Sequence, residues 1–582
     1  MLRKNLGILV VLGLVVLFLY YASYFYDPTH DKKNAYINYT SDAAGMEGMV
    51  VSASSYASKV GIDILKKGGN AIDASVAVGF ALAVTYPQAG NIGGGGFMVL
   101  RVHDSIITSI DYREKAPSAS TRNMYLDSSG KFDPDLSQFG HLSSGVPGSV
   151  AGMLYALEKY GTMSRDEVMQ PAIDLAENGF EIEPKFAESL NANFDDFSEF
   201  PSTKKIFTKK NSLNFFAGEK FVQKDLASTL RRIRDDGRDG FYKGVTADMI
   251  ENEMVSNDGI ITKEDLANYQ PVERNVISTN YKGYDVYSMA PPSSGGIALI
   301  NLLNMIEHDP VPDTNNSIDM ANYYHTVIES MKRVYADRSE YLGDPDFYKI
   351  PQQELIDKSY SKERRREITD SITPSSEIKP GLGVIHKESD QTTHYSVIDK
   401  YGNMVSVTTT LNNTYGSCVV VNGAGFLLND EMDDFASKPG EPNMFGLIGS
   451  DANSIQPNKR MLSSMTPTLI LKDGKPLMIL GSPGGGKIIT SVFLTILNVL
   501  DFKLPLHIAI DKPRFHHQWL PVYLQTEQGA FDTAVTNILQ QKGHRINEIG
   551  DYGNVCAILI DWNRHIFYGH ADRRGYGIAL SY

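Results

Sequence analysis

Apolar and polar residues are arranged along the chain in patterns that predict both helices and strands. A helix is predicted at residues 70–85, where Asn70 caps a continuous apolar stretch. Residues 395–411 contain two β-rich runs separated by a short polar turn, which predicts a hairpin, and residues 468–480 predict a second one. Strand pairs beside amphipathic helices indicate an α+β layered fold.

The longest apolar run lies at the N-terminus. Arg3 and Lys4 precede residues 6–26, which carry no charge and are long enough to cross a bilayer as a helix. The run ends in several tyrosines that suit the membrane interface, so we expect residues 1–26 to be a retained signal anchor rather than a cleaved signal peptide. The polar residues 27–45 predict a stalk. The basic flank places the body outside the cytoplasm, on the periplasmic or extracellular side.

A second polar region lies in the middle of the body, at residues 358–389. Its arginine triplet and its proline and glycine residues predict an exposed or mobile linker. Thr392 follows this linker, at the start of the first predicted hairpin. If the chain is cut before Thr392, the new α-amine, whose pKa is near ~8, can act as a base for the adjacent hydroxyl. Threonine is also common in strands, so this pattern alone favours an ordinary strand residue.

Composition excludes several classes of function. The chain has 582 residues with 42% hydrophobic and 21% charged residues, as expected of a large globular enzyme. Its net charge of −14 argues against nucleic-acid binding. Only two cysteines are present, Cys418 and Cys556, which allow at most one disulfide. We expect no metal site and no cofactor, because no cysteine or histidine cluster has ligand spacing.

Several motifs occur in a characteristic order and spacing. They are Asp111-Tyr112-Arg113-Glu114, Pro291-Pro292-Ser293-Ser294-Gly295-Gly296, Tyr335-Ala336-Asp337-Arg338, Gln391-Thr392-Thr393-His394-Tyr395-Ser396, Thr410-Leu411-Asn412, Asn429-Asp430-Glu431-Met432-Asp433-Asp434-Phe435, Pro457-Asn458-Lys459-Arg460-Met461-Leu462-Ser463-Ser464-Met465, Gly481-Ser482-Pro483-Gly484-Gly485 and Pro513-Arg514-Phe515-His516-His517-Gln518-Trp519. This set resembles the bacterial type of the γ-glutamyltransferase family over nearly the whole chain after the stalk.

The resemblance implies a fold and a processing event. The expected fold is an N-terminal-nucleophile hydrolase with a four-layer αββα sandwich, preceded here by one transmembrane helix. The chain is expected to be made as a precursor and cut between Gln391 and Thr392. The products would be a large subunit, residues 46–391, and a small subunit, residues 392–582, which stay together as a heterodimer.

The resemblance also implies roles for individual residues. The catalytic set consists of the nucleophile Thr392, the orienting residue Thr410, and Gly484 and Gly485, whose backbone N–H groups can stabilise an oxyanion. The substrate-binding set reads both charged ends of an amino acid: Arg113, Ser463 and Ser464 for the α-carboxylate, and Asn412, Glu431 and Asp434 for the α-ammonium.

The expected reaction cleaves glutathione or another γ-glutamyl donor and passes the glutamyl group to water, an amino acid or a dipeptide. Three alternatives remain: a relative that transfers poly-γ-glutamate, an acylase that removes a dicarboxylic acyl group from a β-lactam, and a non-catalytic membrane-tethered binding protein. Residues 439–446 resemble the lid loop of bacterial-type members. This loop departs from some of those members, because Phe445 stands where they carry tyrosine.

Two further motifs suggest other chemistry. Residues 481–487 match most of a phosphate-binding loop, but Ile488 replaces the hydroxyl residue that would hold magnesium. His516 and His517 suggest a metal, yet neighbours on a strand point to opposite faces and no third ligand is evident. We therefore expect neither ATP nor metal binding from these segments.

Overall fold

The computed structural model describes residues 41–210, 213–381, 392–436 and 451–582. Two seven-stranded sheets form its centre, and neighbouring strands in both sheets are antiparallel. Sheet A contains, in spatial order, β1 (Asp42–Gly45), β18 (Ile566–Ala571), β17 (Cys556–Asp561), β13 (Lys475–Gly481), β12 (Thr468–Lys472), β9 (Tyr284–Ser288) and β8 (Ile277–Tyr281). Sheet B contains β19 (Ile578–Ser581), β2 (Gly48–Ser52), β10 (Thr393–Asp399), β11 (Met404–Thr410), β3 (Gly95–Val102), β4 (Ile106–Asp111) and β7 (Val272–Arg274).

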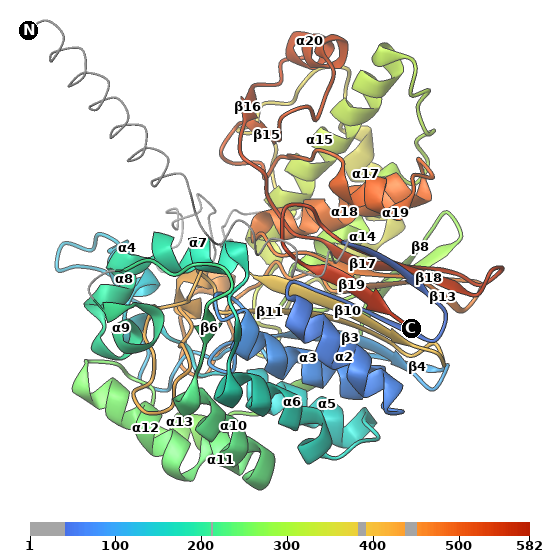
Figure 1. Ribbon diagram of the computed structural model, residues 1–582. Coiled ribbons are helices and arrows are strands. Elements are labelled where there is room, and N and C mark those ends of the chain that lie inside the picture. The colour runs from blue at the N-terminus through green and yellow to red at the C-terminus, as the bar shows by residue number, and fades with distance from the viewer. Residues whose placement is uncertain (1–40, 211–212, 382–391, 437–450) are drawn as a thin grey trace, which may run out of the picture. The chain divides into compact units, whose positions relative to one another are not determined.

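The two sheets pack against each other and helices cover their outer faces (Figure 1). Strands β10 and β11 of sheet B contact β13 of sheet A. The other face of sheet B is covered by α2 (Ser55–Lys66), α3 (Ala71–Thr85) and α5 (Ser149–Tyr160), whereas α14 (Gly295–Ile306) and α18 (Gly486–Leu500) cover sheet A. The result is a four-layer αββα sandwich, as the resemblance implied.

The locally encoded elements are confirmed. Helix α3 begins after Asn70, whose Oδ1 accepts the backbone N–H of Asp73 at 3.0 Å while the Asp73 carboxylate accepts the N–H of Asn70 at 2.8 Å. This reciprocal cap satisfies backbone donors at the helix start. Strands β10 and β11 form the first predicted hairpin, and β12 and β13 form the second.

The stalk and the polar linker differ from expectation. Residues 42–45 are not part of a stalk but form β1, because they pair with β18 at the edge of sheet A. The prediction of an exposed or mobile linker is also wrong over Lys358–Arg366, because these residues form helix α17. Arg364 is buried there and donates to Asp337 at 3.2 Å, so polar composition did not mean exposure. Residues 382–391 lie outside the described residues.

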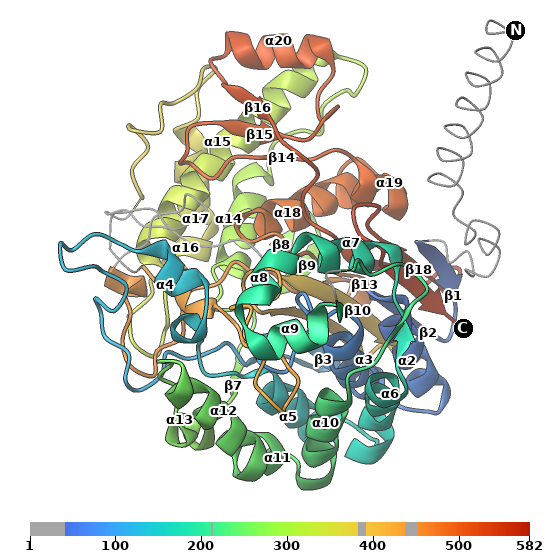
Figure 2. The same cartoon turned by 60° about the vertical axis from the view of Figure 1, so that its left-hand side comes forward.

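A smaller lobe rises beyond the helices of sheet A (Figure 2). It contains part of α15 (Ser317–Tyr341), α20 (Thr533–Gln541) and a three-stranded sheet of β14 (Phe515–His516), β15 (Leu524–Thr526) and β16 (Ile546–Glu548). The expected signal anchor at 1–26 lies outside the described residues. Among the residues that are described, no helix is long and apolar enough to cross a membrane.

Candidate active site

Thr392 lies at the open end of the central hairpin of sheet B. It directly precedes β10 and is 8% exposed. Thr393 pairs with Thr409 of β11, so continuing the antiparallel register by one residue places Thr392 opposite Thr410. The Thr410 hydroxyl accepts the backbone N–H of Asn412 at 2.8 Å. The hairpin therefore brings the expected nucleophile and its expected orienting residue together.

Gly484 and Gly485 lie in the loop between β13 and α18. Their φ angles are +124° and +51°, in the region that favours glycine. The end of β13 lies beside the start of β10. The two strands are so close that a Cβ atom at Gly481 would collide with the ring of His394. Side chains alternate along a strand, so Thr392 and His394 face the same side. The glycine loop and Thr392 consequently lie at the same end of the sandwich.

His394 is buried beside Thr392 but is not suited to act as a base. Its Nδ1 lies 2.9 Å from Thr408 Oγ1 and its Nε2 lies 3.1 Å from Ser396 Oγ. Burial lowers the pKa of His394 to about 3, so the ring is neutral at physiological pH. Both ring nitrogens are occupied by hydroxyl groups, which indicates a structural role for this histidine.

Arg113 is surrounded by acidic residues at the end of sheet B where Thr410 lies. Thr410 pairs with Gly95 of β3, and Tyr112 exchanges backbone hydrogen bonds with Gly96. It follows β4 and is 1% exposed. Its guanidinium donates to Glu431 and Asp434, which lie on the short 3₁₀ helix η4 (Glu431–Asp434). Glu114 Oε2 is 3.5 Å from Arg113 Nη1. Three buried carboxyl groups thus share one guanidinium.

This excess of acid changes the protonation of the cluster. Burial raises the pKa of Glu114 to about 8, although Arg113 opposes the shift. Burial likewise raises the pKa of Glu431 well above its usual value. Arg113 remains charged, because the neighbouring carboxylates outweigh the effect of burial on its pKa. The raised pKa values favour the neutral forms of Glu114 and Glu431, so the cluster carries less negative charge than its three carboxyl groups suggest. One fixed cation beside several carboxyl groups suits a ligand that carries both charges.

Hydrogen bonds to backbone carbonyls hold the remaining expected binding residues near this cluster. Arg113 Nη2 donates to the carbonyl of Leu462 at 3.2 Å, which sets Ser463 and Ser464 beside the guanidinium. Asn412 Nδ2 donates to the carbonyl of Asp430 at 3.1 Å, next to Glu431. All six expected binding residues are described, and the fold gathers them from four separate segments. Gln391 and the lid residue Phe445 lie outside the described residues.

Sequence reasoning did not single out Glu114 or Arg338, although both lie in quoted motifs. Arg338 of α15 donates to Ser464 Oγ at 2.9 Å. Glu114 could have been identified because it is adjacent to Arg113 in the sequence. Nothing in the sequence indicates that Arg338 contacts Ser464, which lies far along the chain.

The two neighbouring histidines form hydrogen bonds within the protein. His516 contacts Thr490 and Gln518, each at 2.9 Å, and His517 accepts the N–H of Trp519 at 3.1 Å. Within the described residues there is no group of three or more side chains that could hold a metal ion. Cys418 and Cys556 are both buried and free.

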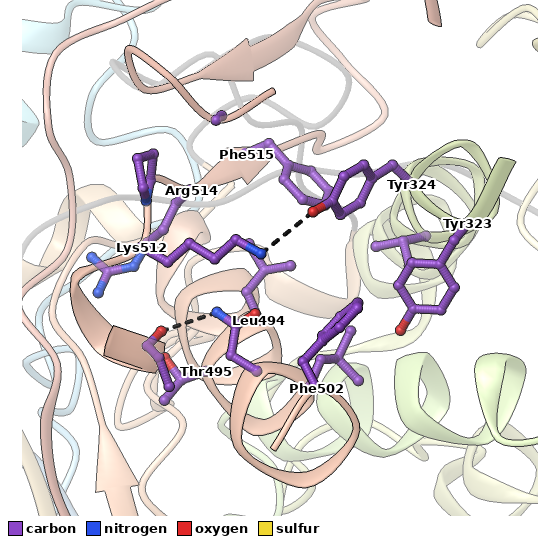
Figure 3. Close-up of a pocket in the computed structure, with 14 residues that line it drawn as sticks. Tyr323, Tyr324, Leu494, Thr495, Phe502, Lys512, Arg514 and Phe515 are labelled. Atoms are coloured by element: carbon purple, nitrogen blue, oxygen red, sulfur yellow. Dashed lines mark hydrogen bonds between the residues drawn. The ribbon is translucent and has the colours of Figure 1, made fainter. Parts of the chain in front are cut away.

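Cavities also lie outside the cluster. Figure 3 shows one between α15 and α18, where Lys512 donates to Tyr324 Oη at 3.5 Å. Its volume is about 20 Å³, enough for one water molecule but not for an amino acid. A larger hollow of about 660 Å³ is lined by Asn413, next to Asn412, and by Asp135, Asp196 and Glu199. Of these two, the larger has room for a small-molecule substrate.

Comparison with known proteins agrees with this geometry. Residues 57–582 match the family described as Gamma-glutamyltranspeptidase. A glutathione hydrolase proenzyme of Escherichia coli (strain K12) is 48% identical over 530 residues, covering 91% of this chain and 90% of that protein. The crystal structure of Helicobacter pylori γ-glutamyltranspeptidase is 48% identical with a TM-score of 0.55, covering 58% of this chain and 96% of that chain.

A cephalosporin acylase from Bacillus halodurans matches over a larger part of the fold. Its TM-score is 0.81 at 25% identity, with 95% of this chain and 98% of that chain covered. The layered sheets and the site at their edge define a fold of the N-terminal-nucleophile type, shared by both groups of enzymes. The chain belongs to the γ-glutamyltranspeptidase family, and its activity is that of a γ-glutamyltransferase, with hydrolase and transferase chemistry.

Proposed function

We propose that this enzyme cuts its own chain between Gln391 and Thr392 and then uses Thr392 as its nucleophile. The carrying observation is the register of β10 and β11, which sets Thr392 opposite Thr410 at the end of the sandwich where the glycine loop begins. In the cutting step the Thr392 hydroxyl attacks the carbonyl carbon of Gln391. The peptide C–N bond breaks as an ester forms on the hydroxyl oxygen, which frees the Thr392 α-amine. Water then hydrolyses the ester, which releases the Gln391 carboxylate and restores the Thr392 hydroxyl.

The same hydroxyl then acts on the donor. The free α-amine takes the hydroxyl proton as the oxygen attacks the γ-carbonyl carbon, and the backbone N–H groups of Gly484 and Gly485 stabilise the oxyanion. The departing amine of the donor receives the proton, leaving a γ-glutamyl ester on Thr392. Water or an amino group then attacks this ester and restores the threonine hydroxyl. Thr410 orients the amine and the hydroxyl throughout.

The acidic cluster around Arg113 selects the donor. Arg113, Ser463 and Ser464 bind the α-carboxylate, while Glu431, Asp434 and Asn412 bind the α-ammonium. The names of the similar proteins support glutathione as a donor. The acceptor is water, an amino acid or a dipeptide, and no cofactor takes part.

A second candidate is an acylase that removes a dicarboxylic acyl group, supported by the similarity of the fold to the cephalosporin acylase. The arrangement of Arg113 between two acids favours a zwitterionic glutamyl group over a simple diacid. Poly-γ-glutamate transfer is a further alternative, which differs in the acceptor that is used.

Thr392→Ala tests the central proposal. The variant should remain a full-length, inactive chain, because it lacks the hydroxyl that the strand register sets opposite Thr410. Intact-mass spectrometry of the wild type should find a fragment that begins at Thr392, and Thr410→Ala serves as a partial-loss comparison. Cleavage of the alanine variant at the same bond would shift the role to Thr393.

We also propose that residues 1–26 anchor the protein in a membrane, with the body on the periplasmic or extracellular side. The uncharged run at 6–26 and its basic flank support this. Membrane fractionation should retain the protein, and protease added outside the cytoplasmic membrane should digest its body. A soluble form with a new N-terminus near Ser23 would indicate signal cleavage, and a body protected from that protease would place it in the cytoplasm.

A further inference from the structure

We propose that Arg338 is a positioning residue for donor recognition: it orients the hydroxyl of Ser464 and adds positive charge to the site of the donor's α-carboxylate. This inference rests on the proposed γ-glutamyl chemistry and adds one residue to the same site. No role for Arg338 follows from the sequence, where it appears only as the last residue of the motif Tyr335-Ala336-Asp337-Arg338.

The contact between Arg338 and Ser464 fixes the direction of a hydrogen bond. Arg338 is 2% exposed, Ser464 is 4% exposed, and Arg338 Nη2 lies 2.9 Å from Ser464 Oγ. A guanidinium has donors only, so the serine oxygen must be the acceptor. The hydroxyl hydrogen of Ser464 is consequently directed away from Arg338. A carboxylate, which only accepts hydrogen bonds, is the complementary ligand for a hydroxyl held in this way.

Arg338 supplies a positive charge to the site in addition to that of Arg113. Burial lowers the pKa of Arg338 to about 10, which leaves it charged at neutral pH. In the structure Glu431 and Asp434 bind Arg113. When a donor's ammonium binds these two acids, its carboxylate needs cationic partners of its own. Arg338 lies close enough for its charge to interact with that of Asp434, so it contributes to the same electrostatic environment.

Helix α15 also connects the carboxylate site to the glycine loop. Tyr335 lies one turn before Arg338 on the same face of the helix, and its hydroxyl donates to the carbonyl of Gly486 at the start of α18. One rigid helix therefore contacts Ser464, which is expected to bind the α-carboxylate, and the segment next to the expected oxyanion site. This arrangement would hold the two ends of the donor at a fixed separation.

The test compares two donors that differ only at the α-carboxylate. These are L-γ-glutamyl-p-nitroanilide and the analogue whose α-carboxylate is replaced by a carboxamide. Arg338→Met should lower kcat/KM for the carboxylate donor by about 10- to 100-fold, mainly through KM, because a hydrogen bond to a charged group is lost. The carboxamide donor should change little. Arg338→Lys, which keeps the charge without the planar fork, should give a smaller loss of the same kind.

Arg333→Met provides a matched control on the same helix. Arg333 is equally buried but donates to Glu329 at 2.8 Å, away from the site, so its loss should not alter the ratio of the two donors. In a Ser464→Ala background, Arg338→Met should add little, because both changes remove one interaction. Equal loss with both donors, or multiplying effects in the double variant, would overturn the positioning role.

Two outcomes separate this inference from the proposed function. If the wild type does not prefer the carboxylate donor, carboxylate recognition itself is wrong and the inference falls with it. If the wild type shows the preference and Arg338→Lys retains it in full, the inference alone is overturned. Should Arg338→Met fail to fold, Arg338→Lys still decides the question, since self-cleavage and thermal melting report whether that variant is intact.

Discussion

Arg113 illustrates how single residues can be kept buried and charged before a substrate arrives. Its guanidinium is paired with Glu431 and Asp434, the acids expected to bind the opposite end of the donor. A buried charge without a partner is costly, so these residues stabilise one another. A zwitterionic amino acid can insert between them and exchange each pair for a new one. Each charged group of the protein then still has an oppositely charged partner.

Arg113→Ala and Asp434→Ala test this arrangement. Loss of either partner of a desolvated charge pair typically costs about 2–5 kcal/mol, so both variants should lose most use of L-γ-glutamyl-p-nitroanilide. Self-cleavage should largely persist, because it needs no such donor. The wild type should strongly prefer this donor over glutaryl-p-nitroanilide, which lacks the α-amino and α-carboxylate groups.

Arg101→Ala is the matched control, because Arg101 is a buried arginine that donates to Gly402 at 2.9 Å, at the opposite end of the β10–β11 hairpin from Thr410. It should leave the preference between the two donors unchanged. Equal turnover of both donors by the wild type would favour the acylase alternative.

Elements were predictable where their signals are local. Helix α3 and the hairpin of β10 and β11 follow from a cap, an apolar run and a turn that are close together in the sequence. Strand β1 and helix α17 were missed because their partners are distant: β1 pairs with β18, and Arg365 of α17 donates to Asp309 at 2.8 Å. The same reason explains why motifs identified Arg113 and Ser464 but not the contact of Ser464 with Arg338.

His570 is predicted to make the attachment of β1 dependent on pH. It lies on β18 and contacts Asp42 of β1 through Nδ1, and Asp511 through Nε2 at 3.0 Å. Burial lowers the pKa of His570, but the hydrogen bonds and charges of Asp511 and Asp42 outweigh it and raise the pKa overall. A raised histidine pKa stabilises the fold below the unfolded value of about 6.5, and this contribution is lost as pH rises through the folded pKa.

The measurement compares the wild type with His570→Asn. The variant should be less stable by about 1 kcal/mol at pH 5.5, since Asp42 is partly exposed and screened, and the difference should shrink at pH 8.5. Hydrogen exchange at residues 42–45 should increase in the variant at the lower pH. Because His565 is an exposed histidine nearby in the sequence, His565→Asn is a suitable control. A difference that grows with pH would contradict the assignment.

At the scale of the whole molecule, the proposed cut divides the sequence but not the sheets. In sheet B, β10 and β11 follow Thr392 and lie between β2 and β3, which precede it. In sheet A, β12 pairs with the earlier strand β9, and β18 pairs with the earlier strand β1. Each sheet therefore contains hydrogen-bonded strand pairs that join the two sides of the cut. The segments before and after the cut also contribute residues to the same buried core between the sheets.

The two proposed fragments should consequently remain one folded unit after cleavage. A sample that is fully cut on a denaturing gel should elute as a single species in size-exclusion chromatography, and native mass spectrometry should give the summed mass of the two fragments. Separation should require denaturant, because pulling the fragments apart would expose the inner strands β2, β3, β10 and β11 on their hydrogen-bonding edges. Thr392→Ala, uncut, should elute at the same volume. Release of a small fragment under native conditions would mean that the interleaved sheets do not hold the subunits together.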